Sequence, residues 1–299
     1  MRLRKKELLM QEIREEASIL PCSGSPIHRF LTSMNSKFLI AAIASIIILC
    51  SAFITNDYIL VNIVSASATF MTSDNLGNLY IVVNDELRKY DSEGKLLKTY
   101  SDKSLGSLAF VDANDPLTIL LHYKDLRQLV FLDNMLSIKG SPIILDNLGV
   151  LQPTLVCNSY DNGFWIYDQQ EFQLERFNKD LSISNESGNI VQLTGISIKP
   201  NFLVETGGKV YLNDPDNGIL VFDKFGTYSK ILPFKNIVSF QVLEENLIYL
   251  KGSQLSQYNM KTFEEKSMDM PAKKILSARY EKERLFLQDS VSVKIYSWK

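Results

Sequence analysis

The stretch "DNLGNLYIVVNDELRKYDSEGKLLKTY", from Asp74 to Tyr100, decides the fold. Three runs of β-forming residues alternate here with turns rich in aspartate, asparagine and glycine. The second strand ends in an aromatic residue followed by an acid, Tyr90 and Asp91, and Gly94 follows in the turn. An aspartate at this place bonds the backbone two residues further on, and glycine supplies a positive φ. The stretch therefore predicts consecutive antiparallel strands joined by tight turns.

The same unit recurs along the chain. Its signature is a strand that ends in an aromatic residue or leucine and is followed by Asp or Asn, at Tyr90-Asp91, Leu132-Asp133, Phe177-Asn178, Phe222-Asp223, Tyr258-Asn259 and, with serine in place of the acid, Tyr296-Ser297. A more apolar strand precedes each one, centred on Tyr80, Leu120, Trp165, Tyr211, Tyr249 and Phe286. Six copies about 40 residues apart predict an all-β fold, a six-bladed β-propeller whose blades are four-stranded antiparallel sheets.

The remaining strands complete the blades. Inner strands are predicted at 68–73, 107–112, 154–159, 202–207, 239–244 and 275–280, and outer strands at 96–100, 136–140, 181–185, 228–232 and 264–268. The sixth outer strand is missing. We expect "YILVNIV" (58–64) to supply it and so to close the ring, because an open ring leaves two unpaired sheet edges. A β-sandwich does not predict six copies of one pattern, and a seventh blade needs about 40 more residues.

The pattern "DNLGNLYIVVNDELRKYDSEGKLL" resembles NHL-like and related six-bladed propellers. Residues 58–299 resemble more closely a group of uncharacterised bacterial propeller proteins that carry an N-terminal export signal. In those proteins "DNLGNLY" opens the first blade and "NDPDNGILVFDKFG" the fourth, much as here. The resemblance covers about four-fifths of the chain. It implies the fold and export, and it implies no particular reaction.

The N-terminal region carries a predicted export or membrane-anchoring signal. Residues 38–54, "FLIAAIASIIILCSAFI", form an uncharged run that predicts a hydrophobic helix. If translation starts at Met1, the basic tail 1–37 stays in the cytoplasm and the run is a transmembrane anchor. If it starts at Met34, the tail is not translated and the run is a signal peptide, with Cys50 near the place of a lipoprotein cysteine. Each alternative places a propeller domain, 58–299, outside the cytoplasm, in the bacterial periplasm or at a membrane.

Composition excludes several classes of function. The 299-residue chain is 45% hydrophobic and 22% charged, as in ordinary globular proteins. Its formal net charge of −2 gives it no general attraction to nucleic acid. The three cysteines are widely spaced and only His28 and His122 are histidines. This pattern predicts no disulfide framework and no Cys/His metal site.

Candidate chemical groups are few. Propellers of the lactonase and arylesterase kind hold calcium on the axis with Glu, Asn and Asp from several blades; here the inner strands offer Thr72, Asp112, Asn158, Glu205, Glu244 and Arg279. The preferred interpretation of Glu205 and Glu244 is that of solvated carboxylates at strand ends. "NDPDNG" (213–218) and "DNG" (161–163) read as tight turns, because the spacing and distal glutamate of a calcium loop are missing.

Other distinctive residues are expected to be structural. His122 has no partner at ligand spacing and is predicted to lie at the surface or to be hydrogen-bonded in the structure. Cys157 is predicted to be core, and Trp165, Tyr211 and Tyr249 to pack between blades.

No catalytic, cofactor-binding or metal-binding residue is therefore assigned. The sequence favours a non-enzymatic scaffold that binds another protein of the envelope, because a ring of blades offers a rigid face with many loops. The alternative is a metal-dependent, lactonase- or esterase-like hydrolase, and a third hypothesis is capture of a glycan or small molecule.

Overall fold

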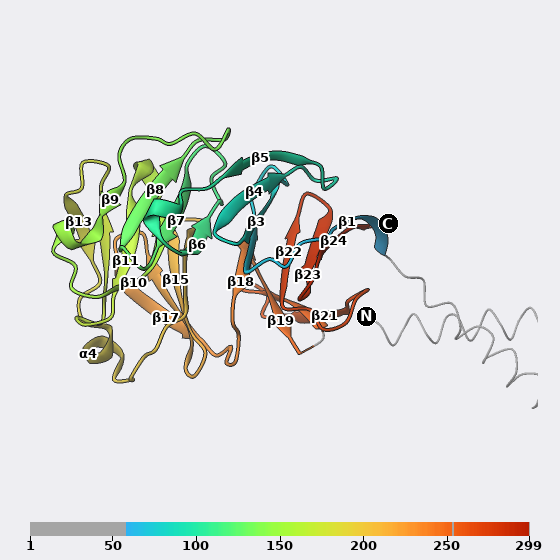
Figure 1. Ribbon diagram of the computed structural model, residues 1–299. Coiled ribbons are helices and arrows are strands. Elements are labelled where there is room, and N and C mark those ends of the chain that lie inside the picture. The colour runs from blue at the N-terminus through green and yellow to red at the C-terminus, as the bar shows by residue number, and fades with distance from the viewer. Residues whose placement is uncertain (1–57, 253, 299) are drawn as a thin grey trace, which may run out of the picture. The chain divides into compact units, whose positions relative to one another are not determined.

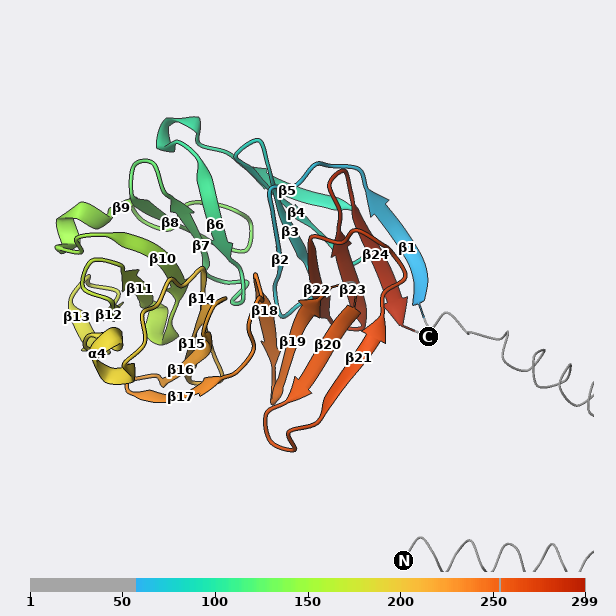
Figure 2. The same ribbon diagram turned by 90° about the horizontal axis from the view of Figure 1, so that it is seen from below.

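Residues 58–252 and 254–298 are described by a computed structural model, in which six four-stranded antiparallel sheets follow one another around a ring (Figures 1 and 2). The six-bladed propeller predicted from the repeat is thereby confirmed. The tail 1–37 and the hydrophobic run 38–54 lie outside the described residues. Within the described residues, no helix has the length and apolar character needed to cross a membrane.

Each blade runs from an inner strand at the axis to an outer strand at the rim. Blades 1 to 3 contain β2 (Phe70–Ser73), β3 (Leu79–Val83), β4 (Glu86–Tyr90) and β5 (Leu96–Tyr100); β6 (Leu108–Asp112), β7 (Ile119–Tyr123), β8 (Gln128–Leu132) and β9 (Ile143–Ile144); and β10 (Pro153–Asn158), β11 (Phe164–Asp168), β12 (Gln173–Phe177) and β13 (Ile183–Glu186). A short helix, α4 (Ile190–Thr194), lies in the connection to blade 4.

Blades 4 and 5 repeat this order. They contain β14 (Phe202–Thr206), β15 (Lys209–Asp214), β16 (Gly218–Asp223) and β17 (Tyr228–Leu232); and β18 (Phe240–Leu243), β19 (Asn246–Lys251), β20 (Gln254–Asn259) and β21 (Glu265–Asp269). The predicted turns at 213–218 and 161–163 are the connections of β15 to β16 and of β10 to β11.

Blade 6 joins the two ends of the propeller. It contains β22 (Ser277–Glu281), β23 (Arg284–Gln288), β24 (Val293–Trp298) and, as its outer strand, β1 (Tyr58–Val64). The strand β1 runs antiparallel to β24, with Tyr58 opposite Trp298 and Val64 opposite Val293. The prediction that 58–64 closes the ring is confirmed. The strand β1 covers the outer edge of β24, so the first and last strands of the propeller share one sheet.

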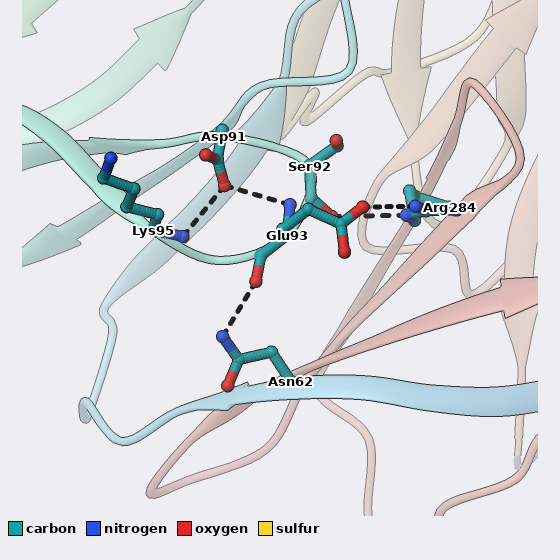
Figure 3. Close-up of polar contacts among 6 residues, drawn as sticks. All are labelled: Asn62, Asp91, Ser92, Glu93, Lys95 and Arg284. Atoms are coloured by element: carbon teal, nitrogen blue, oxygen red, sulfur yellow. Dashed lines mark hydrogen bonds and ion pairs between the residues drawn. The ribbon is translucent and has the colours of Figure 1, made fainter.

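A polar latch joins blade 6 to the first blade (Figure 3). Asn62 of β1 donates from Nδ2 to the carbonyl of Glu93 at 2.8 Å, in the turn between β4 and β5. Arg284 of β23 donates to the carbonyl of Ser92 at 3.3 Å and forms an ion pair with the Glu93 carboxylate. The closing strand is thus held by its own sheet and also by the neighbouring blade.

The recurrent acid after the third strand has the predicted role. The side chain of Asp91 accepts hydrogen bonds from the backbone N–H groups of Glu93 and Lys95. The same motif recurs at Asp133, Asp223 and Asn259. Blade 3 differs, because Asp180 rather than Asn178 bonds the N–H of Ser182. In blade 6 the position falls inside β24 at Ser297, where the chain pairs with β1.

The core lies between adjacent blades, where the second strands carry fully buried side chains. Trp165, Tyr211 and Tyr249 are buried in these layers, as predicted, and Cys157 is buried with Trp165. Large side chains of one blade therefore fill the space against the next, which fixes the blades around the axis.

Two predictions about blade 2 are wrong. The outer strand lies at 143–144 and not at 136–140, where only Ile138 makes an isolated bridge to Leu132. Leu136 has a positive φ of 59°, so this segment turns where an extended strand was expected.

The prediction for His122 is the second that the structure corrects. His122 lies within β7 and is 3% exposed, and its Nε2 has no hydrogen-bond partner. It is therefore neither a surface residue nor a fully hydrogen-bonded one.

The buried His122 makes the fold sensitive to acid. Burial lowers the pKa of His122 from 6.5 to about 4. The unfolded chain takes up this proton below pH 6.5 and the folded chain does not, so stability is lost as the pH falls from 6.5 to 4. The loss amounts to about 3 kcal/mol. We expect His122→Leu to remove this component, measured as denaturant unfolding at several pH values. Equal pH dependence of parent and variant contradicts the assignment.

Candidate functional site

The central channel opens at one face of the ring. Its lining comes from the inner strands β2, β6, β14, β18 and β22, and Asn75 and Asn114 extend it into the turns that join the first strand of a blade to the second. We therefore place its open end among these turns. In an antiparallel four-stranded blade, the turn from the third strand to the fourth lies at the same end. We call this end the mouth face. The strand β1 begins and β24 ends at it, as the antiparallel pairing of Tyr58 with Trp298 requires.

Four phenylalanine rings form an apolar floor deeper in the channel. Ring centroids are 5.3 Å apart for Phe70 and Phe110, 6.1 Å for Phe110 and Phe202, and 5.2 Å for Phe202 and Phe240. These residues come from blades 1, 2, 4 and 5. Because blades 2 and 4 are not neighbours, the contact between Phe110 and Phe202 brings side chains together across the axis.

Polar side chains surround the space between this floor and the mouth. The cavity has a volume of about 150 Å³, which is room for roughly five water molecules. Its polar lining includes Ser73, Asp112, Asn114, Thr206, Arg279 and Glu281. We call Ser73, Asp112, Arg279 and Glu281 the channel site. Ser73 Oγ is buried and has no hydrogen-bond partner among the described residues, so it is an unsatisfied polar group in this lining.

Asp112 and Arg279 are the buried charges of the channel site. Asp112 is at the end of β6, and its carboxylate accepts from the N–H of Asn114 at 3.0 Å and from the N–H of Asn158 at 2.8 Å. Burial raises the pKa of Asp112 in spite of these bonds. Burial also lowers the pKa of Arg279 to about 10, so the guanidinium stays charged at neutral pH. Burial likewise raises the pKa of Glu281.

The structure separates the six inner-strand candidates. Thr72, Asp112 and Arg279 line the channel, and Asn158 bonds the backbone of blade 2 through its amide. Glu205 turns to the seam between blades 3 and 4, where it accepts hydrogen bonds from Trp165 and Ser159. Glu244 is exposed beside a different hollow. The two glutamates do not meet on the axis, and Glu205 is not a solvated carboxylate.

Within the described part of the chain, no group of three or more His, Cys, Asp or Glu side chains is placed to hold a metal ion. In addition, a cation entering the channel meets the positive charge of Arg279. The channel thus combines the guanidinium of Arg279 with the carboxyl groups of Asp112 and Glu281.

A second, larger hollow separates blades 5 and 6. Its volume is about 530 Å³, and apolar side chains such as Ile248, Leu255, Met268 and Leu285 dominate the lining. Glu244 and Lys282 lie at this hollow as well. Only the side chain of Glu281 belongs to both this hollow and the channel site.

The mouth face differs from the opposite face in the kind of apolar side chain that it exposes. On the opposite face the exposed large apolar residues are Leu126, Leu151, Leu193, Val238, Leu276 and Val291. The mouth face exposes Leu76 and Leu117 in its first-to-second-strand turns, and Met135, Leu181, Phe225 and Phe263 in its third-to-fourth-strand turns. Trp298 is exposed at the same end.

No family model and no curated protein matches the sequence. Among solved structures, the fold is similar to that of virginiamycin B lyase from Staphylococcus aureus, with a TM-score of 0.57 and 10% identity over 81% of this chain and 100% of that one. It is also similar to a streptogramin B lyase structure (TM-score 0.54, 11% identity, 81% and 97%) and to the Pan2 WD40 domain of Neurospora crassa (TM-score 0.54, 10% identity, 81% and 95%). At these identities the likeness shows the fold alone.

Proposed function

We propose that this protein is a non-enzymatic propeller that binds another protein of the cell envelope through its mouth face. The observation that carries the proposal is the distribution of exposed aromatic side chains. Every large exposed phenylalanine or tryptophan of the described residues, Phe225, Phe263 and Trp298, lies on this face, and so does the exposed methionine, Met135. Aromatic residues and methionine are enriched in protein interfaces, whereas leucine and valine are weak markers.

The shape of the mouth face suits a partner protein. Phe225 and Phe263 are 55% and 71% exposed and lie in equivalent turns of the adjacent blades 4 and 5. Their turns are held by the Asx hydrogen bonds of Asp223 and Asn259. Rigid turns present these rings at a small cost in conformational entropy on binding.

The location outside the cytoplasm belongs to the same proposal. It rests on the apolar run 38–54 and on the resemblance to exported bacterial propellers. The mass of the mature N-terminus, measured on the intact protein from its native cells, decides among an anchor, a cleaved signal peptide and a lipid on Cys50.

Charged substitutions on the mouth face test the proposal. The partner is isolated by cross-linking in native membranes, identified by mass spectrometry, purified and titrated against the propeller. We expect Phe225→Asp and Phe263→Asp each to weaken its affinity roughly 30-fold, the effect of losing a buried aromatic anchor. The matched variants Leu193→Asp and Val238→Asp on the opposite face leave the affinity unchanged. If all four variants bind like the parent, or only the opposite-face pair loses binding, the mouth face is not the interface.

A further inference from the structure

The propeller contains two buried arginines whose surroundings differ sharply. Arg176 on β12 is 1% exposed and is fully engaged: its guanidinium donates to Ser159, Asn178, Ser184 and the carbonyl of Tyr160. It also lies over the Tyr160 ring, 3.7 Å from the centroid. Such a saturated arginine holds blade 3 together and is explained by structure alone.

Arg279 on β22 is 8% exposed but has almost no partners. Its one hydrogen bond within the described chain runs from Nη1 to the carbonyl of Phe240 at 3.2 Å. The Nε group is buried and has no partner. Asp112 and Glu281 act on it through space, and neither forms an ion pair with it. An arginine that is charged, buried and largely unbonded costs stability, so its presence calls for a reason outside the free fold.

The position of Arg279 supplies that reason. Its side chain lines the channel between the phenylalanine floor and the mouth face. Guanidinium groups bind carboxylates through two parallel N–H···O bonds. The unpartnered hydroxyl of Ser73, in the same lining, can donate to the same ligand. Asp112 and Glu281 add negative charge to the channel, which disfavours a doubly charged phosphate more strongly than a singly charged carboxylate.

The size of the channel limits the ligand further. A volume of about 150 Å³ accepts a carboxylate on a short stem and is too small for a nucleotide or a glycan chain. The open end lies at the centre of the mouth face, so a group that projects from a protein seated there reaches the channel site.

We propose that the channel site binds a carboxylate of the partner polypeptide, from an acidic side chain or from the chain end, with Arg279 as its principal donor and Ser73 as a second. This inference rests on the proposed function, because it gives the mouth face a partner with a protruding acidic group.

Small probes test the channel without the partner. The purified full-length chain is titrated with N-acetylglycine, which carries a chain-end carboxylate, and with N-acetylaspartate amide, which carries a side-chain carboxylate. N-acetylglycine amide is the neutral control at equal ionic strength. We expect at least one acid to raise the unfolding midpoint and the neutral amide to leave it unchanged. The acid that binds more tightly identifies the source of the carboxylate. No response to either acid overturns the proposal, and so does a response to free acetate alone.

Matched arginine variants separate a ligand anchor from a structural residue. We expect Arg279→Met to keep or raise the unfolding midpoint of the free protein and to weaken binding of the acid at least 10-fold. Arg279→Lys keeps the positive charge but loses the paired N–H donors of the guanidinium, so we expect it to bind the acid with intermediate affinity. Arg176→Met lowers the midpoint strongly. A comparable fall for Arg279→Met shows a structural role and overturns the proposal, as does undiminished binding. The probes need no partner, so the two proposals can fail separately. The channel site can fail to bind the acids while Phe225→Asp and Phe263→Asp still weaken partner binding. Conversely, the acids can bind while these two variants leave partner binding unchanged.

Discussion

A chain that begins at Ser65, and therefore lacks β1, is expected to unfold roughly 10 °C or more below a chain that begins at Asn56. The reason is that β24 loses its whole hydrogen-bonded partner strand. Val64 is buried, and Tyr58 and Val61 are partly buried against blade 6. Re-exposing three such side chains costs about 5 kcal/mol, and each kcal/mol shifts the midpoint of a domain of this size by about 2–4 °C. Circular dichroism against temperature gives the measurement.

The chain that begins at Asn56 is the control, since it keeps every described contact of the propeller. A synthetic peptide of residues 58–64, added to the shortened chain, is expected to recover part of the lost stability, because it re-forms the outer strand of blade 6. If the shortened chain unfolds with the control, the closure by β1 contributes nothing to the fold, contrary to what its pairing with β24 implies.

Gly218→Ala is expected to destabilise the propeller by about 3 kcal/mol or more. Gly218 is the first residue of β16 and has a φ of 126°, a backbone conformation that residues other than glycine rarely adopt. A Cβ atom placed there lies 2.3 Å from the carbonyl oxygen of Leu232 on β17. Since backbone cannot swing aside as a flexible side chain can, the two strands must separate where Ile219 pairs with Leu232. Denaturant unfolding measures the loss.

Gly207→Ala provides the comparison for this substitution. Gly207 also has a positive φ, of 58°, but nothing lies within 4 Å of the position of its Cβ. It therefore carries only the conformational penalty of about 1–2 kcal/mol. Equal losses at Gly207 and Gly218 would mean that the contact with Leu232 relaxes freely and that backbone conformation explains both.

The repeat made the architecture predictable from sequence, because each blade carries its own local signals. An apolar strand, a second strand and an Asx turn are specified within about 25 residues, and six copies average out errors in any one. The role of 58–64 followed from counting strands, since blade 6 otherwise lacks its outer edge. The outer strand of blade 2 was misplaced because Leu136 adopts a left-handed conformation that leucine seldom takes. The sequence contains no signal for that.

The channel site was only half predictable. Asp112 and Arg279 were among the inner-strand candidates, together with Glu205 and Glu244, which lie elsewhere. Neighbouring residues of a strand point to opposite sides, so an uncertainty of one residue in register decides between the axis and a blade seam. His122 was misjudged for a related reason: the strand extends two residues beyond the apolar run and takes the histidine into the interior. Arg176 finds all its hydrogen-bond partners within its own blade, whereas Arg279 bonds only the carbonyl of Phe240 on the adjacent blade 5, and no sequence pattern distinguishes the two arginines.

The shared sixth blade has a consequence for biogenesis. The strand β1 leaves the ribosome before every other strand of the propeller, yet its partner β24 is made after all of them. Until β24 has been made, β1 has no partner strand in this chain. It carries the apolar residues Ile59, Leu60 and Ile63, and an unpaired apolar strand can pair with strands of other chains. The first strand of the propeller is therefore protected only when the whole chain has been made. A chaperone that holds unfolded chains would shield β1 until then.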